Sequence, residues 1–169
     1  MKLISLLLFV CALSLSAPVS KGQGSSRTGP DPSVIRDPDI EKDSNHNLSV
    51  ARQYFKLRKA YVASLQRCEE IIAGNPNFAK IDEVLFIAGE SSLALAENKG
   101  RQNPSLYVTY DANGKRTLTS EEFREIGREY LTRLVNDHRN SQFRKQAEKR
   151  LGAVGGPKPE KETTVQPEK

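Results

Sequence analysis

The stretch from Asp111 to Glu122 has the oxygen-bearing side chains and much of the spacing of a calcium-binding loop. An EF-hand loop binds Ca²⁺ through oxygen ligands at its first, third, fifth and twelfth positions, and it turns sharply at a glycine in the sixth. Asp111, Asn113 and Glu122 occupy the first, third and twelfth positions. Lys115 occupies the fifth and Arg116 the sixth, so both the charge and the turn geometry oppose calcium.

The residues around this loop predict a β-hairpin. Residues 106–110 form a β-branched and aromatic run, and Pro104 before them disfavours an entering helix. The Asp-Ala-Asn-Gly sequence at 111–114 is typical of a turn, after which residues 115–119 can form a returning strand. We therefore expect a hairpin, with a calcium-responsive loop at 111–122 as the alternative.

The other side chains with catalytic or metal-binding potential form no motif. His46 and His138 lie in separate segments, and neither has another ligand-type residue at metal-binding spacing. No serine nucleophile motif or phosphate-binding glycine loop is present in the sequence. The paired carboxylates at 69–70, 82–83 and 121–122 are typical of helix starts and exposed helix faces. The sequence predicts a protein that is not an enzyme and that uses no cofactor or metal.

The first residues of the chain predict export. Residues 1–16 combine Lys2 with an apolar run and small residues, the pattern of a signal peptide too short to span a bilayer. Cys11 is either removed with this peptide or lipidated. In the first case Cys68 is the only cysteine left, and its helical spacing with apolar neighbours predicts a core position.

Composition divides the rest of the 169 residues into three sections. Residues 17–44 and 152–169 are rich in Gly, Pro, Ser and charge and predict a disordered leader and tail. Residues 45–151 have apolar residues at helical spacing and predict one all-α domain, with the hairpin in an insertion at 101–119.

Five helices are expected in this domain, at about residues 47–58, 60–73, 79–98, 120–136 and 141–151. Asn47 is a suitable N-cap for the first helix. Thr119 and Glu122 have the spacing of a capping box for the fourth. The third helix is apolar on two sides, which indicates that it lies between neighbouring helices.

The helices repeat as antiparallel pairs with a period of about 34 residues, the tetratricopeptide period. Phe55, Tyr61, Ser64 and Pro76 lie near the aromatic, aromatic, small and proline positions of that repeat in the first pair. Gly89 matches the glycine of the first helix in the second pair.

The runs YFKLRKAYVASLQRCEEIIAGNP and EVLFIAGESSLALAENK resemble the BamD family, the periplasmic tetratricopeptide lipoproteins of the outer-membrane barrel-assembly machine. The resemblance covers residues 48–151. It implies a helical scaffold that binds other proteins on the periplasmic side of a bacterial outer membrane. Arg52 and Gly127 depart from the repeat, standing where it has glycine and alanine. With about two and a half repeats, the stack needs a cap, a partner or a second copy to cover its open face.

The basic residues of the helices favour an acidic protein partner or a solvated surface over nucleic acid, because glutamates are interspersed among them. We expect envelope proteins or a second copy of the chain as partners, no nucleic acid, and no transmembrane segment. The expected contacts are Tyr54 and Arg58 near the first turn between helices, with Tyr107 and Tyr110 on the hairpin, because aromatic residues and arginines dominate interfaces. Tyr54 fits a core position equally well.

Overall fold

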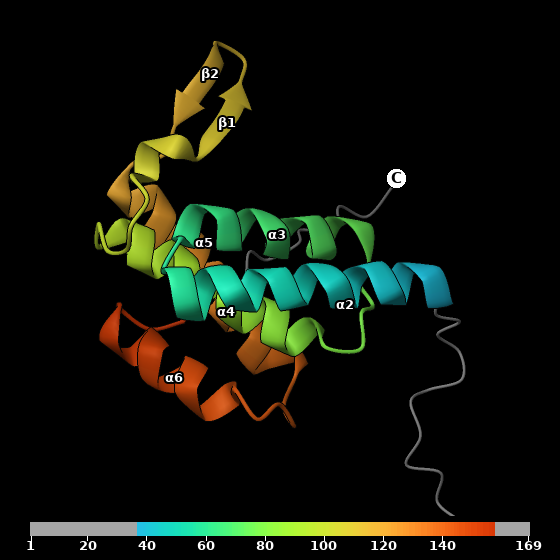
Figure 1. Cartoon of the computed structure of the whole chain (residues 1–169). Helices are drawn as coiled ribbons and strands as arrows, with labels where there is room; N and C mark the ends of the chain where they lie inside the picture. The colour runs from blue at the N-terminus through green and yellow to red at the C-terminus, as the bar shows by residue number, and fades with distance from the viewer. Residues whose placement is uncertain (1–36, 158–169) are drawn as a thin grey trace, which may run out of the picture. The chain divides into compact units, whose positions relative to one another are not determined.

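The computed structural model describes residues 37–157 (Figure 1). These residues form five α-helices and one two-stranded antiparallel sheet, which confirms the predicted all-α fold with a hairpin insertion. The expected signal peptide at 1–16, Cys11, residues 17–36 of the expected leader and residues 158–169 of the expected tail lie outside the described residues.

The first described helix, α2 (Pro38–Arg52), begins earlier than expected. Asp37 is its N-cap, and the Asp37 carboxylate accepts a hydrogen bond from the backbone N–H of Asp39 at 2.9 Å. The expected start at Asn47 is therefore wrong, and residues 38–44 belong to the helix rather than to a disordered leader. The first turns of this helix are polar because the helix buries only a narrow stripe, made by Ser44, Leu48 and Ala51. That polar composition had suggested disorder.

The helix continues beyond Arg52 as a π-helical segment, η1 (Gln53–Arg58). Lys59 ends it in the left-handed region with φ of 50°, and the N–H of Ala60 donates to the carbonyl of Tyr54 at 2.9 Å. The chain then reverses into α3 (Tyr61–Gly74), which packs antiparallel to α2 (Figure 1).

The third helix of the stack, α4 (Ile81–Ala96), lies between two neighbours as its two apolar sides predicted. It packs against α3 on one side and against α5 (Ser120–Asp137) on the other. The expected capping box of α5 is present, because the Thr119 hydroxyl accepts from the N–H of Glu122 and the Glu122 carboxylate accepts from the N–H of Thr119.

The last helix, α6 (Arg144–Ala153), packs against α5 through buried Ala147 and Leu151. It extends two residues beyond the expected end at 151, so Gly152 lies within the helix. The helix ends instead through Gly155 and Gly156, whose φ values of 97° and 85° are accessible to glycine. The N–H of Gly156 donates to the carbonyl of Leu151 at 2.8 Å and so satisfies a terminal acceptor.

The connection between α4 and α5 contains a 3₁₀ turn, η2 (Pro104–Leu106), and then the expected hairpin of β1 (Val108–Asp111) and β2 (Gly114–Thr117). Asp111 pairs with Gly114 across a two-residue turn. The hairpin projects from the helix stack beside the end at which η1 meets α3 (Figure 1).

Candidate protein-binding site

The calcium-like loop of the sequence folds as the hairpin and its junction with α5, and its two carboxylates have other partners. The guanidinium of Arg116 lies 3.2 Å from an oxygen of Asp111 and 2.7 Å from an oxygen of Glu122. The backbone N–H of Thr119 and the guanidinium of Arg116 lower the pKa of Glu122 by bonding its ionised form. Arg116 therefore occupies the space between Asp111 and Glu122, which would be the first and twelfth ligands in the calcium-responsive alternative. Residues 37–157 contain no group of three or more His, Cys, Asp or Glu side chains placed to hold a metal ion.

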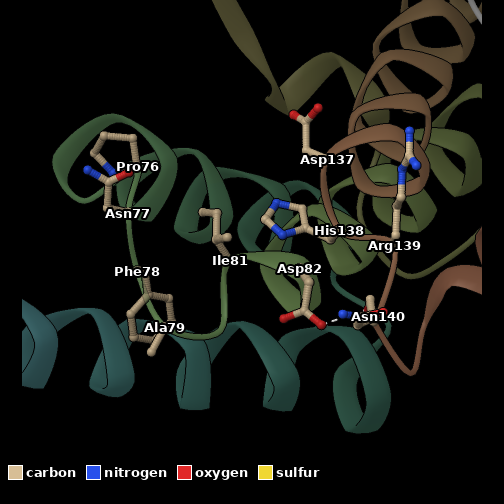
Figure 2. A pocket seen from close by; sticks show the side chains of 11 residues that line it. Pro76, Asn77, Phe78, Ala79, Ile81, Asp82, Asp137, His138, Arg139 and Asn140 are labelled. Atoms are coloured by element: carbon tan, nitrogen blue, oxygen red, sulfur yellow. Dashed lines mark hydrogen bonds between the residues drawn. The ribbon is translucent and has the colours of Figure 1, made fainter. Parts of the chain in front are cut away.

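A pocket of about 460 Å³ between the α3–α4 and α5–α6 turns brings together Asp82, His138 and Ser141, the residue types of a hydrolytic triad (Figure 2). The hydroxyl of Ser141 donates directly to the Asp82 carboxylate at 2.7 Å. In a triad the imidazole lies between the serine and the carboxylate and accepts the serine proton. Within the described residues the imidazole of His138 makes no such bond. The Ser141–Asp82 bond joins the turn before α6 to the first turn of α4, which is a structural role.

Tyr107, an expected interface residue, directly precedes β1 at the base of the hairpin. Its ring is half-buried and meets Phe123 edge-on, with 5.5 Å between ring centroids. Its hydroxyl donates to an oxygen of Glu69 on α3 at 2.8 Å. Tyr107 is partly exposed, as Tyr54 is, but its ring packs against Phe123 of α5 and its hydroxyl bonds to the half-buried Glu69. These contacts give it a structural role, and its part in binding stays a prediction.

Glu69 is the centre of a polar cluster that the sequence did not predict. Tyr130 on α5 donates to the same carboxylate oxygen as Tyr107, at 3.3 Å. Burial raises the pKa of Glu69, and the two tyrosine hydrogen bonds oppose that rise. Burial and the neighbouring carboxylate raise the pKa of both tyrosines. The cluster fixes the base of the hairpin to α3 and α5, and its three members are too far apart in sequence to form a recognisable motif.

Tyr54 and Arg58, the other expected pair, contact each other on η1. The guanidinium carbon of Arg58 lies 5.6 Å from the centroid of the Tyr54 ring, within the range of a cation–π interaction. Tyr54 is partly exposed and Arg58 is exposed, so both reach the surface. Leu57 between them is 76% exposed.

The loop after α4 holds this segment close to the base of the hairpin. The N–H of Arg101 donates to the carbonyl of Lys59 at 3.0 Å, and the side chain of Gln102 accepts from the N–H of Ala63 at 3.1 Å. Gly100 lies so close to this turn that a Cβ on it would be 2.6 Å from the carbonyl oxygen of Lys59. The loop and the η1–α3 turn are therefore one packed unit.

Further exposed apolar side chains lie on the elements between α4 and α5. Leu106 on η2 is 58% exposed and Tyr110 on β1 is 75% exposed. We call the residues that η1, η2 and β1 present here the hairpin-end surface: Tyr54, Leu57, Arg58, Leu106 and Tyr110. Of the expected contact residues, it includes Tyr54, Arg58 and Tyr110. Leu57 and Leu106 were not among the expected contact residues. Their positions, at the end of a helix and in a loop, could have indicated that their side chains are exposed.

Neither family models, nor the sequences of characterised proteins, nor solved structures give a significant match to this chain. Membership of the tetratricopeptide class remains a prediction from the sequence. Among residues 37–157, no helix has both the length and the apolar character needed to cross a membrane.

Proposed function

We propose that this chain is an exported, non-enzymatic scaffold that binds other envelope proteins through the hairpin-end surface, in bacterial outer-membrane assembly or envelope organisation. The observation that carries the proposal is the exposure of large apolar side chains at one end of the domain. Four large hydrophobic residues are exposed in the part of the chain that the structure describes, and Leu57, Leu106 and Tyr110 of this surface are three of them. Exposed apolar residues that gather in one region favour a protein interface.

The cation–π pair of Tyr54 and Arg58 adds residue types that contribute strongly to binding energy. The Glu69 cluster and the packed loop around Gly100 hold η1 and the hairpin base in place. A surface held in this way loses little conformational entropy on binding, which favours affinity.

The helix stack supports the scaffold class. Gly89, which matches the glycine of the tetratricopeptide repeat, packs against Gly127, which stands where that repeat has the small residue alanine. The insertion between α4 and α5 contains η2 and the hairpin. The proposed binding residues therefore lie on this insertion and on η1, which is next to it.

Cross-linked capture from envelope extracts, followed by mass spectrometry, tests the proposal. The bait is the tagged full chain, compared with a variant that carries Leu57→Ser and Tyr110→Ser. The matched control carries Gln146→Ser and Lys149→Ser on the exposed face of α6. We expect wild type and control to recover the same outer-membrane assembly proteins and the hairpin-end variant to lose them. Equal recovery by all three, or recovery of the bait alone, contradicts the proposal.

A further inference from the structure

Four cationic side chains, on the segments of the hairpin-end surface or on segments next to them in the fold, have no acidic partner among the described residues. Lys56 and Lys59 are exposed around η1, Arg101 is exposed in the loop after α4, and Lys115 is exposed on β2. None of these four forms an ion pair within residues 37–157. The guanidinium of Arg58 is close enough to interact with the Tyr54 ring, and no carboxylate of residues 37–157 pairs with it.

Local structural needs account for only some of these charges. Lys56 and Lys59 lie at a helix C-terminus, where cations interact favourably with the macrodipole. Lys115 lies on a strand of a two-stranded sheet, where charge opposes edge-to-edge aggregation. Arg101 is neither at a helix end nor in a strand, and its side chain is exposed beside the η1–α3 turn. Its charge adds to a positive field that extends over three separate segments.

The same end of the domain also contains fixed negative charges. Glu97 pairs with Lys99 at 2.6 Å, and Asp111 pairs with Arg116 at 3.2 Å. The field is therefore a pattern of mixed charge with an excess of cations. Defined side chains of a protein can match such a pattern, whereas the uniform negative charge of a bilayer or a nucleic acid meets the carboxylates unfavourably.

We infer that the hairpin-end surface binds an acidic segment of a partner protein that carries an apolar anchor side chain. The carboxylates of that segment pair with Lys56, Lys59, Arg101 and Lys115, and its anchor covers exposed Leu57 or Leu106. This inference rests on the proposed function and adds the chemistry of the partner. Charge complementarity identifies the partner as acidic, and the exposed leucines require that it is not purely polar.

Fluorescence anisotropy with the full chain and labelled twelve-residue peptides tests the inference. The first peptide alternates Glu and Ser around one central Phe. The second replaces every Glu with Gln, and the third replaces the Phe with Ala. We expect the first peptide to bind at least tenfold more tightly than either of the others, with an affinity that falls as salt is added because exposed charges are screened. Equal binding of the first two peptides overturns the inference.

Charge-reversal variants locate the site. Lys56→Glu with Arg101→Glu should weaken binding of the acidic peptide at least tenfold. The control, Lys145→Glu with Lys149→Glu on α6, makes the same change in net charge on exposed lysines that have no ion pair among the described residues, and it should leave binding unchanged. Equal losses in both variants overturn the inference, because they indicate a non-specific effect of net charge. Circular dichroism melting of each variant establishes that it is folded.

Two further probes address the other anionic partners. A single-stranded oligonucleotide and vesicles containing phosphatidylglycerol are titrated at the same salt concentration. Tighter binding of either probe than of the acidic peptide overturns the inference. If the envelope capture still depends on Leu57 and Tyr110 while no acidic peptide binds, the scaffold function stands and the partner chemistry is wrong. If the capture does not depend on those residues, the proposed function itself fails.

Discussion

Gly89 on α4 and Gly127 on α5 face each other where these two helices cross. A Cβ built on Gly89 would lie 2.6 Å from the side chain of Leu131 and 3.2 Å from the carbonyl oxygen of Gly127. A Cβ built on Gly127 would lie 2.7 Å from Leu93 and 3.0 Å from the carbonyl oxygen of Gly89. A side chain at either position would therefore meet a leucine of the facing helix first and its backbone carbonyl next.

Alanine at either glycine should destabilise the domain. Overpacking costs about 1–3 kcal/mol, and the better helix propensity of alanine offsets about 1 kcal/mol of that cost. We expect Gly89→Ala and Gly127→Ala to lower the free energy of unfolding by up to about 2 kcal/mol, measured by urea denaturation. Gly152→Ala in α6 is the control, because nothing lies within 4 Å of its added Cβ. It should be neutral or stabilising, and a destabilised control together with unaffected crossing variants would contradict the packing account.

The Glu69 cluster predicts opposite results for two substitutions. Glu69→Ala leaves the half-buried hydroxyls of Tyr107 and Tyr130 without their acceptor, which should cost about 1–3 kcal/mol. Glu69→Gln keeps an acceptor oxygen and removes a half-buried charge, so it should cost much less. Thermal melting at neutral pH distinguishes the two variants. Equal destabilisation would show that the hydrogen bonds to the tyrosines are not what holds the hairpin base.

The raised pKa of Glu69 also predicts the direction of a pH effect. The folded protein binds the Glu69 proton more tightly than the unfolded chain does, so this group stabilises the fold at low pH. That contribution is lost as the pH rises from the ordinary glutamate pKa through the raised pKa of the folded state. The melting temperature of Glu69→Gln relative to wild type should therefore increase with pH over this interval. A difference that is constant or that decreases with pH would contradict the assignment.

Arg52 and Glu83 form a two-bond ion pair between α2 and α4, with N–O distances of 2.6 Å and 2.5 Å. The Glu83 side chain is only 13% exposed, so removing Arg52 leaves a poorly solvated carboxylate. We expect Arg52→Lys, which cannot make both bonds, to lose about 1 kcal/mol of stability. A double-mutant cycle with Glu83→Gln measures the coupling between the two side chains. A coupling energy near zero would indicate that the pair is screened by solvent.

The position of Arg116 between Asp111 and Glu122 predicts no response to calcium. A site with a dissociation constant a hundred times below the calcium concentration would stabilise the fold by about 2.7 kcal/mol. We expect no change in melting temperature when millimolar calcium is added, with magnesium as the control for ionic strength. A shift specific to calcium would restore the calcium-responsive alternative for residues 111–122.

The sequence predicted most of the helices because their signals are local. Apolar spacing and the Thr119–Glu122 capping box determine where elements lie regardless of their neighbours. The start of α2 was missed because its first turns bury almost nothing apolar, although Asp37 followed by Pro38 is a recognisable start signal. The core position predicted for Cys68 is confirmed, because its side chain is fully buried.

The candidate site was less predictable, because it depends on contacts between distant segments. Nothing in the local sequence of Tyr107 indicates that its hydroxyl finds Glu69 on another helix. Arg52 departs from the repeat pattern for a similar reason, since its partner Glu83 lies on α4. Leu57 is 76% exposed and lies in a π-helical segment, whose side-chain spacing differs from that of the α-helix predicted there.

Site-specific photo-crosslinking in the living source cells tests whether the hairpin-end surface contacts a partner. A photoreactive amino acid replaces Leu57 in one strain, Tyr110 in a second and exposed Gln146 on α6 in a third. We expect adducts with the same envelope protein from positions 57 and 110, and none from position 146. Adducts from all three positions alike, or from position 146 alone, would contradict the claim that this chain binds its partner through the hairpin-end surface.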